Sequence, residues 1–233
     1  ITGASGLLGS HFLLEYAPKS KAVVALYRSE SGKQLVGQLF MFYQKSEFWD
    51  RITWVKGDLN DVDLLTRIIQ DADLVIHSAA LVSFEKEDKE TLYQVNVRGT
   101  ENVLKAIKTA QVNQLVFISS VATIRNKSQE GYFVENGVVS GERSWTDYAR
   151  SKMQAEQLVL KARNSSLDVV IINPGVILGP GNINASSTAI FKTVRDGLRF
   201  YTSGVNGVVD VRDVVDGTIK LLAIKALSFS LFY

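Results

Sequence analysis

The sequence predicts an α/β protein in which a parallel sheet carries helices on both faces. Short apolar stretches of strand length alternate with longer stretches of helical periodicity, the pattern of repeated β–α units. The strand stretches are apolar almost throughout, as expected for parallel strands that are buried on both faces. A glycine-rich turn at residues 2–9 leads directly into the first helical stretch. These observations indicate a doubly wound parallel sheet.

The elements follow from the apolar pattern in chain order. Counting an incomplete first strand at Ile1, the second to sixth strands are predicted at residues 22–27, 52–56, 74–77, 115–119 and 169–173. Helices are predicted from Leu7 onward and at residues 34–43, 61–70, 89–110 and 147–163, with Asp61 as an N-cap. A polar loop separates the last strand pair at about 124–144. Only Ile1 precedes the glycine turn, where a whole buried strand is expected, so we expect missing residues at both ends.

The overall composition excludes several classes of function. The 233 residues are 46% hydrophobic and 21% charged, which is typical of a globular protein. A formal net charge of +2 predicts neither a nucleic-acid partner nor a membrane-surface partner. The chain has no cysteine, which excludes disulfides, thiolate catalysis and Cys-ligated metals. No apolar run reaches the length of a membrane span, and we expect a cytoplasmic protein.

The glycine turn reads Thr2-Gly3-x-x-Gly6-x-x-Gly9. Glycine allows a positive φ and lets a ligand approach bare backbone. A helix N-terminus adds free N–H groups and the positive end of a dipole, so the turn can hold a pyrophosphate. The alternative is an ordinary strand-to-helix turn. The predicted cofactor contacts here are Gly3, Ser5, Gly6, Leu7, Leu8 and Gly9.

Ligands of doubly wound sheets bind beyond the carboxyl ends of the strands. The second predicted strand ends at Arg28, which suits the 2′-phosphate of NADP, whereas an acidic residue there would favour NAD; Lys33 could add charge. Arg28 could also be a solvated loop cation. Asp58, with Leu59 after it, follows the third strand and could accept a bond from an adenine amino group, or simply cap a helix or a turn.

The fourth predicted strand ends His77-Ser78-Ala79-Ala80, where the small residues Ala79 and Ala80 allow a cofactor to lie against the backbone. His77 is either a packed strand-end histidine or a ligand contact. His11, the other histidine, is predicted to be structural, and two histidines alone build no metal site, so no metal is expected.

The chemistry is predicted to reside in Tyr148 and Lys152, which lie four residues apart and therefore share a helix face. An adjacent ammonium stabilises a phenolate, so we expect Lys152 to lower the pKa of Tyr148 from its usual ~10 and make it an acid/base near neutral pH. A hydroxyl at the end of the fifth strand, Ser119 or Ser120, could hold the substrate oxygen.

The chain resembles the short-chain dehydrogenase/reductase superfamily in its extended branch, which includes nucleotide-sugar epimerases and dehydratases, 3β-hydroxysteroid dehydrogenases and dihydroflavonol reductases. The resemblance covers nearly the whole length. Its motifs are the glycine turn, Gly57-Asp58, His77-x-Ala79-Ala80, Asn96-Val97-x-Gly99-Thr100, Ser119-Ser120, Tyr148-x-x-x-Lys152, Asn173-Pro174-Gly175 with Leu178-Gly179-Pro180, and Val211-x-Asp213-Val214.

The resemblance implies a Rossmann-type domain over residues 1–175 and a small, incomplete substrate-binding part over 176–233, interleaved with the last sheet elements. It implies Tyr148 as the acid/base, with Ser120 (Ser119 as the backup) orienting the substrate oxygen. Lys152 would lower the Tyr148 pKa and bind the nicotinamide ribose. Pro174 and Val176 would lie beside the nicotinamide. Asn96 and the Val211-x-Asp213 stretch would be structural, and homodimers often form through the two long helices.

The loop after Ser120 lacks the Tyr-Gly pair that the epimerases usually carry, and Arg28 departs from NAD-preferring epimerases. Both features resemble the dihydroflavonol-reductase and ketone/aldehyde-reductase branch. We therefore expect an NADP-dependent reductase of a small-molecule carbonyl, with NAD as the alternative cofactor. A nucleotide-sugar epimerase or dehydratase and a non-catalytic dinucleotide sensor are the other hypotheses. Substrate contacts are expected at 81–88, at about 124–146 and after Val176, where Leu81, Val82, Phe84 and Phe133 mark either an apolar site or core.

Overall fold

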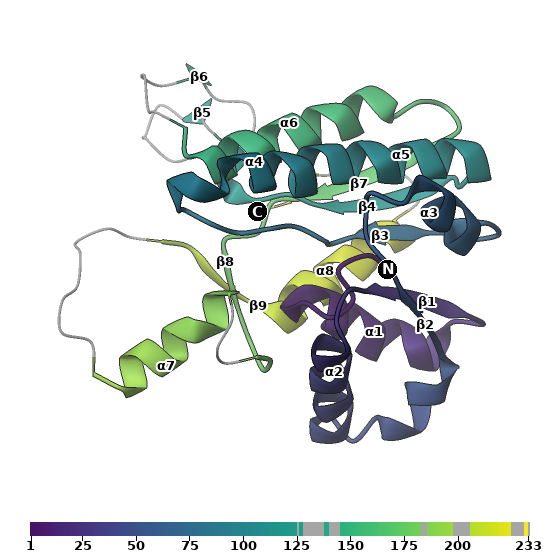
Figure 1. The fold of residues 1–233 in the computed structure, drawn as a ribbon, viewed down its shortest axis with the longest axis horizontal. Helices are drawn as coiled ribbons and strands as arrows, with labels where there is room; N and C mark the ends of the chain where they lie inside the picture. The colour runs from purple at the N-terminus through teal and green to yellow at the C-terminus, as the bar shows by residue number, and fades with distance from the viewer. Residues whose placement is uncertain are drawn as a thin grey trace.

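A parallel sheet runs through the middle of the protein in the computed structural model (Figure 1). The structure describes residues 1–124, 126–127, 138–139, 145–182, 186–197, 206–224 and 231–232. The sheet contains β1 (Val23–Tyr27), β2 (Ile52–Lys56), β3 (Val75–His77), β4 (Gln114–Ile118), β7 (Asp168–Ile172) and β10 (Leu231–Phe232). These strands lie within two residues of the predicted ones wherever a strand was predicted, and the predicted fold class is confirmed.

Residues 1 and 2 occupy the place of a strand between β1 and β3. Leu26 N donates to Ile1 O at 3.0 Å on one side, and Thr2 N donates to Ile76 O at 3.0 Å on the other. Thr2 also forms a parallel bridge with His77. The order across the sheet is therefore β2, β1, residues 1–2, β3, β4, β7 and β10. This order places the glycine turn at the centre of the sheet's carboxyl edge.

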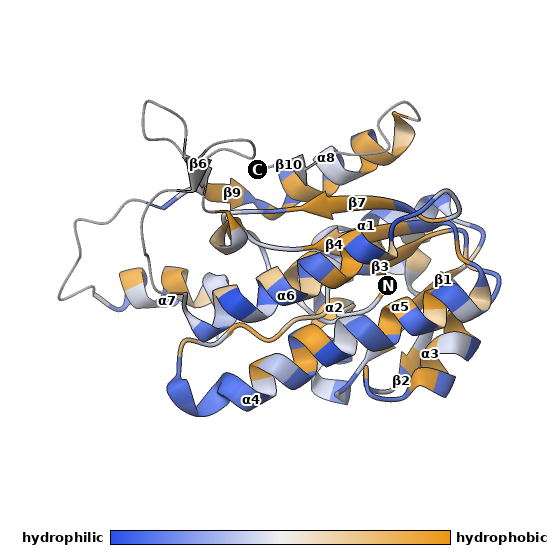
Figure 2. Ribbon diagram, turned by 90° about the horizontal axis from the view of Figure 1, so that it is seen from above, coloured by the Kyte–Doolittle hydropathy of each residue, from blue (hydrophilic) through white to orange (hydrophobic). Residues whose placement is uncertain are grey.

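Helices cover both faces of this sheet because the strand residues alternate between two cores. Leu115 and Phe117 pack toward α3 (Val62–Ile69), α5 (Gly99–Ala110) and α6 (Asp147–Ala162). Val116 and Ile118 pack toward α1 (Leu7–Lys19) and α8 (Val211–Ala223), and α2 (Glu30–Phe42) packs beside α1 on the same side. Figure 2 shows strands β4 and β7 in orange, as hydrophobic segments, whereas the helices α5 and α6 also carry blue, hydrophilic segments.

Two predicted helices differ in detail. Helix α2 begins at Glu30, four residues before the expected start, because the Ser29 hydroxyl accepts from Gly32 N and caps it. The predicted helix 89–110 consists of α4 (Lys89–Leu92), a π-helical turn (Tyr93–Arg98) and α5. A π turn holds one extra residue and rotates the residues that follow it, a feature that periodicity alone does not predict.

The segment after β7 leaves the sheet and then returns to it. Strands β8 (Val176–Leu178) and β9 (Val208–Asp210) pair with each other in parallel, beside α7 (Ala189–Arg195), before α8 packs back on α1. Shorter elements are β5 (Asn126–Lys127), β6 (Val138–Val139) and the 3-10 segments Ser46–Arg51, Lys86–Asp88, Val121–Thr123 and Ser186–Thr188. Most of the predicted loop at 124–144, including Phe133, lies outside the described residues.

The core position of Phe12 makes a testable prediction for stability. Its ring is fully buried between α1 and the sheet, so Phe12→Ala is expected to lower the free energy of unfolding by about 3–5 kcal/mol in urea titrations. Phe42→Ala is the matched control: that ring is 67% exposed, and a change of about 0.5 kcal/mol is expected. Equal losses in the two variants would contradict the packing described above.

Candidate active site

The glycine turn is packed so closely against the end of β3 that side chains are excluded from it. Gly3 has φ = 67°, and a Cβ on it would lie 2.6 Å from Ala79 N. A Cβ on Gly9 would overlap the Gly3 carbonyl oxygen. These are backbone positions that only glycine occupies without strain. The result is an open, backbone-walled seat at the N-terminus of α1, which suits a pyrophosphate.

A cavity of about 380 Å³ opens from this turn along the carboxyl ends of β1, β2 and β3. Eight of the predicted cofactor residues line it, namely Gly3, Ser5, Gly6, Arg28, Asp58, Leu59, Ala79 and Ala80. Ser29, Ser31, Asn60, Gln94, Val95 and Asn182 line it too, although sequence reasoning did not find them. Ser29 and Ser31 had a detectable signal, because they stand at the helix start that directly follows Arg28.

Three further predicted contacts lie at the edge of the turn or behind it. Leu7 lines a smaller adjoining hollow with Ser5 and Gly6. The Leu8 side chain is 7% exposed and packs into the core against the sheet, so only its backbone can face a ligand. Gly9 is buried against the Gly3 carbonyl. Leu8 and Gly9 therefore support the turn rather than line the cavity.

The charged side chains near Arg28, those of Glu30 and Lys33, already contact other protein groups. Glu30 accepts from the Tyr27 hydroxyl at 2.7 Å and lies 4.0 Å from the Lys56 amine. The Lys33 amine lies over the Tyr27 and Trp54 rings, 5.3 and 5.6 Å from their centroids, so the aromatic pair holds the cation predicted to add charge to the site. Arg28 itself is exposed and lines the cavity.

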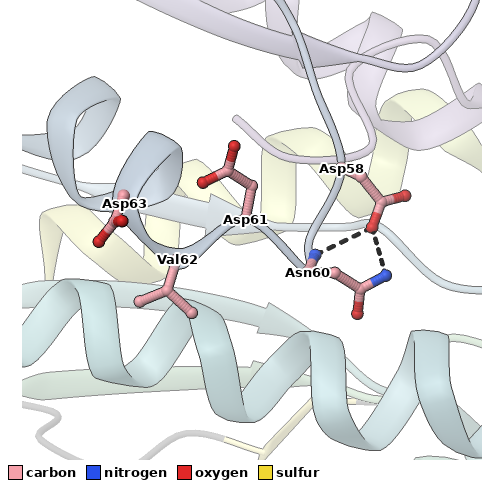
Figure 3. Close-up of a pocket in the computed structure, with 5 residues that line it drawn as sticks. All are labelled: Asp58, Asn60, Asp61, Val62 and Asp63. Atoms are coloured by element: carbon pink, nitrogen blue, oxygen red, sulfur yellow. Dashed lines mark hydrogen bonds between the residues drawn. The ribbon is translucent and has the colours of Figure 1, made fainter.

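Asp58 closes a turn, which is one of the two roles that the sequence left open, and its contact with an adenine stays a prediction. Its Oδ1 accepts from Asn60 N at 2.9 Å and from Asn60 Nδ2 at 2.6 Å, which closes a turn beside the cavity (Figure 3). Asp61 accepts from Leu64 N at 2.9 Å and caps α3 as predicted. Among the described residues no group of three histidines or carboxylates is arranged to hold a metal ion, and this includes the neighbouring carboxylates of Asp58, Asp61 and Asp63.

His77 is a packed histidine whose two ring nitrogens are both used. Its Nδ1 lies 2.7 Å from Thr2 Oγ1, and its Nε2 lies 3.0 Å from Thr100 Oγ1. Thr100 donates its only hydroxyl proton to Asn96 O at 2.6 Å, so His77 carries its proton on Nε2 and Thr2 donates to Nδ1. Burial and the Lys152 ammonium lower the pKa of His77 to about 3, which keeps the ring neutral. His11 is also buried, bonded through Nδ1 to Leu7 O.

Asn96, on the π turn, links two elements of the site. Its Oδ1 accepts from Leu81 N at 2.7 Å, and its Nδ2 donates to Leu81 O at 3.0 Å and to Ser151 Oγ at 2.9 Å. Ser151 in turn donates to Tyr148 O at 2.8 Å. The asparagine therefore fastens the loop after β3 to helix α6, the structural role that the resemblance implied.

Tyr148 and Ser120 meet at the carboxyl edge of the sheet. Helix α6 begins just before Tyr148, with Thr146 as its N-cap accepting from Ala149 N. Ser120 follows β4, the neighbour of β3, and its hydroxyl lies near enough to the Tyr148 phenol to act on the pKa of that phenol. The Ser119 hydroxyl instead donates to Glu156 Oε2 at 2.5 Å, so of the two serines it is Ser120 that reaches the tyrosine.

The pKa of Tyr148 moves opposite to the predicted direction. Burial of the phenol raises its pKa above the usual 10, and the Ser120 hydroxyl opposes that rise. Lys152, one turn along the helix, donates through Nζ to Ile118 O at 2.6 Å and lies over the Phe117 ring. Burial lowers the Lys152 pKa to about 8, and Glu156 acts against that shift. The expected lowering by Lys152 fails here because its amine is held by the sheet backbone.

Pro174 and Val176 lie on the loop that leaves β7, next to the Ser120 segment. Val121 N donates to Pro174 O at 3.1 Å, which ties the loops after β4 and β7 together. Val176 begins β8 and is half-buried. These loops stand side by side at the edge that carries Tyr148, where the resemblance placed the nicotinamide.

Comparison with known proteins assigns the family. A family model described as "Male sterility protein", an NAD-binding family, matches residues 1–217. The chain is 32% identical over 219 residues to "Putative dihydroflavonol 4-reductase" of Synechocystis sp., covering 93% of this chain and 60% of that protein. It is 30% identical to cinnamoyl-CoA reductase 1 of Petunia hybrida, over 95% of this chain and 67% of the relative. The chain belongs to the extended short-chain dehydrogenase/reductase superfamily.

Solved structures agree with this assignment at the level of the fold. UDP-glucuronic acid 4-epimerase from Bacillus cereus, solved with NAD, matches with a TM-score of 0.79 at 21% identity, covering 99% of this chain and 74% of its own. The terminal R domain of the myxalamid PKS-NRPS pathway matches with a TM-score of 0.78 at 25% identity, covering 100% and 64%. As a member of this superfamily the protein uses an NAD(P) dinucleotide.

The glycine turn fits that cofactor, because Gly3, Ser5 and Gly6 line the open cavity at the N-terminus of α1, where backbone N–H groups can face a pyrophosphate. In the part of the chain that the structure describes, no helix is long and apolar enough to cross a membrane.

Substitution of Gly9 tests the seat for the dinucleotide. Gly9→Ala is expected to cost about 1–3 kcal/mol of stability, because its Cβ overlaps the Gly3 carbonyl, and to weaken NAD(P)H binding in fluorescence titrations. Gly217→Ala, in helix α8 with open space around its Cβ, should bind normally and gain about 0.5–1 kcal/mol. Normal binding by a folded Gly9→Ala variant would argue against this seat.

Proposed function

We propose that the protein is an NADP-dependent oxidoreductase that reduces the ketone or aldehyde carbonyl of a small molecule. The observation that carries the proposal is the half-buried Tyr148–Ser120 pair at the sheet edge that also forms the glycine cavity. A phenol whose pKa is raised stays protonated, which suits a general acid in the reducing direction.

The chain's own residues divide the work as follows. Ser120 holds the substrate oxygen, and Tyr148 donates its proton to that oxygen as charge develops on it. Lys152, the third catalytic residue of the proposal, holds a positive charge behind the phenol at neutral pH, since its pKa is about 8. When bound, the nicotinamide supplies the hydride that goes to the carbonyl carbon. Pro174 and Val176 are proposed to border its ring, and Lys152 to contact its ribose.

Preference for NADP rests on the cavity wall beyond β1. Arg28 lines the cavity with Ser29 and Ser31, three groups that can hydrogen-bond a phosphate at the N-terminus of α2. The acid nearest in sequence, Glu30, is bonded to the Tyr27 hydroxyl and does not line the cavity. This arrangement supports a 2′-phosphate more than a free ribose hydroxyl.

The substrate is proposed to be apolar next to its carbonyl group. The Phe84 ring stands edge-on to the Tyr148 ring at 5.8 Å between centroids and is 73% exposed. Val82 is 50% exposed. Both side chains are therefore surface groups, not core, and contact with an apolar substrate would remove them from water.

The relatives' names favour reduction over epimerisation. The Synechocystis and Petunia proteins are named as reductases, whereas the epimerase at 21% identity shares the fold alone. The chain spans only 60% of the length of the Synechocystis relative, so the whole protein's activity is part of the proposal. We also propose the division at residue 175, which is supported by the departure of β8 from the main sheet.

The direct test is an NADPH-oxidation screen over aldehydes, ketones and sugar nucleotides. Turnover with an apolar ketone or aldehyde is expected. Conversion of sugar nucleotides alone, followed by chromatography of the products and without net NADPH consumption, would instead identify an epimerase or dehydratase.

Tyr148→Phe is expected to lower kcat by roughly 10²- to 10⁴-fold while the Kd for NADPH stays near that of the parent, because the ring remains and only the proton donor is lost. Tyr16→Phe, a half-buried tyrosine on α1, is the matched control and should keep full activity. Turnover that survives in Tyr148→Phe would remove the proposed acid.

Arg28→Ala tests cofactor choice. Loss of a charged hydrogen bond to the 2′-phosphate should raise the Kd for NADPH by roughly 10- to 100-fold and leave the Kd for NADH unchanged, as measured by fluorescence titration. Arg67→Ala, exposed on α3, should change neither value. Equal effects of Arg28→Ala on both cofactors would assign Arg28 to the solvent.

A further inference from the structure

Helix α6 carries a third polar residue on the face of Tyr148 and Lys152. Glu156 follows Lys152 by four residues and Tyr148 by eight, so the three side chains stack along one face of the helix. The motif read on this helix ends at Lys152 and does not include this glutamate. In the structure it lies beneath the site, where the loops after β4 and β7 converge.

One oxygen of Glu156 contacts polar groups from both of those loops. Oε2 accepts from Ser119 Oγ at 2.5 Å and from Asn173 Nδ2 at 3.0 Å. Thr123 Oγ1 lies 3.1 Å from the same oxygen and 2.9 Å from Ser120 O, and its single proton serves one of these two acceptors at a time. Ser119 and Asn173 are 4% and 0% exposed, so these bonds are shielded from water. A carboxylate, which only accepts, is the side chain that suits hydroxyl and amide donors converging on one point.

The orientation of Asn173 shows how strongly the carboxylate organises the network. Its Nδ2 faces Glu156 and also lies 2.9 Å from Thr123 Oγ1, while its Oδ1 is buried without a hydrogen-bond partner among the described residues. Rotating the amide by 180° would give Nδ2 a new environment but place Oδ1 against the carboxylate oxygen. The structure leaves one acceptor unsatisfied in order to keep the contact with Glu156.

We propose that Glu156 is a positioning residue for the reaction: its carboxylate ties the loops after β4 and β7 to helix α6 and so holds Ser120 and Pro174 in register with Tyr148 and Lys152. The residues it binds are direct chain neighbours of the working ones, Ser119 of Ser120 and Asn173 of Pro174. The same carboxylate also keeps a negative charge near the buried Lys152 amine. The proposal rests on the proposed reductase function, which gives Tyr148, Ser120 and Lys152 their roles.

The charge has a consequence that a purely structural contact lacks. The groups that face Lys152 are Glu156 and Tyr148 on its own helix, the neutral His77 on β3, and the Ile118 carbonyl and Phe117 ring on β4. Glu156 is the only carboxylate in this set and acts to keep the amine protonated. Its removal should lower the pH above which Lys152 loses its proton.

Glu156→Gln is the test, because glutamine keeps the size and one acceptor but loses the charge. We expect kcat to fall by roughly 10- to 100-fold, the scale of a reacting group misplaced by about 1 Å, with a smaller change in KM. The basic limb of the kcat–pH profile should move to lower pH. In the protein labelled with ¹³C-lysine, we expect an NMR titration midpoint of about 8 for Lys152 in the parent and a lower midpoint in the variant.

Two variants separate the geometric from the electrostatic part. Thr123→Val removes a loop hydroxyl but leaves the carboxylate, so kcat should fall while the Lys152 midpoint stays in place. Glu156→Asp keeps the charge but shortens the reach, and should restore the midpoint but not the full kcat. Glu101→Gln, which removes a glutamate paired with Arg98 and Lys105 on the surface of α5, is the control and should match the parent.

The outcomes are distinct. A folded Glu156→Gln protein with the parent's kcat, pH profile and Lys152 midpoint would overturn the proposal, and so would a loss of kcat that only follows a lowered Tm. If Glu156→Gln does not fold, Thr123→Val and Glu156→Asp decide it by the same readouts. If the parent reduces no carbonyl compound, the proposed function fails, yet the Lys152 midpoint still reports whether Glu156 holds the amine.

Discussion

Parallel register is the constraint on which the whole site depends. Thr2 pairs with His77, and His77 pairs with Phe117, so the strands end at a common edge. The glycine turn, the Ala79-Ala80 end of β3 and the Ser119-Ser120 end of β4 are thereby brought together although far apart in sequence. A displacement of one residue in any pairing would turn alternate side chains to the other core and separate these ends.

Polar contacts within the layer above the sheet make that edge rigid. A chain of hydrogen bonds runs from Thr2 through His77 and Thr100 to Asn96 O, and so connects residues 1–2 of the sheet with the π turn. The Asn96 side chain then fastens the loop after β3 to α6. Each donor in this chain has one acceptor, so the histidine is neutral and its tautomer is determined. Buried groups satisfied in this way favour a single arrangement of the helix that carries Tyr148.

Helix α6 carries the residues proposed for the chemistry, and its four-residue spacing places each of them in a different environment. Tyr148 contacts Ser120 and Phe84 near the surface, Lys152 lies against the backbone of β4, and Glu156 binds the two loops beneath. Desolvation shifts the phenol toward its neutral form and lowers the Lys152 pKa to about 8. An acid that retains its proton and a cation that releases one near pH 8 are suited to proton donation at neutral pH.

The sequence by itself determined the fold class, most strand positions, the Asp61 cap, the tight glycine turn and the placement of Tyr148 and Lys152 one turn apart on the same helix, because local periodicity, helix spacing and glycine chemistry are properties of short segments. The tertiary structure alone decided that Ser120 rather than Ser119 reaches Tyr148, that Lys33 binds aromatic rings, that burial raises the Tyr148 pKa, and that Glu156 joins the site. These depend on contacts between segments many residues apart and on the removal of water, neither of which a spacing rule contains.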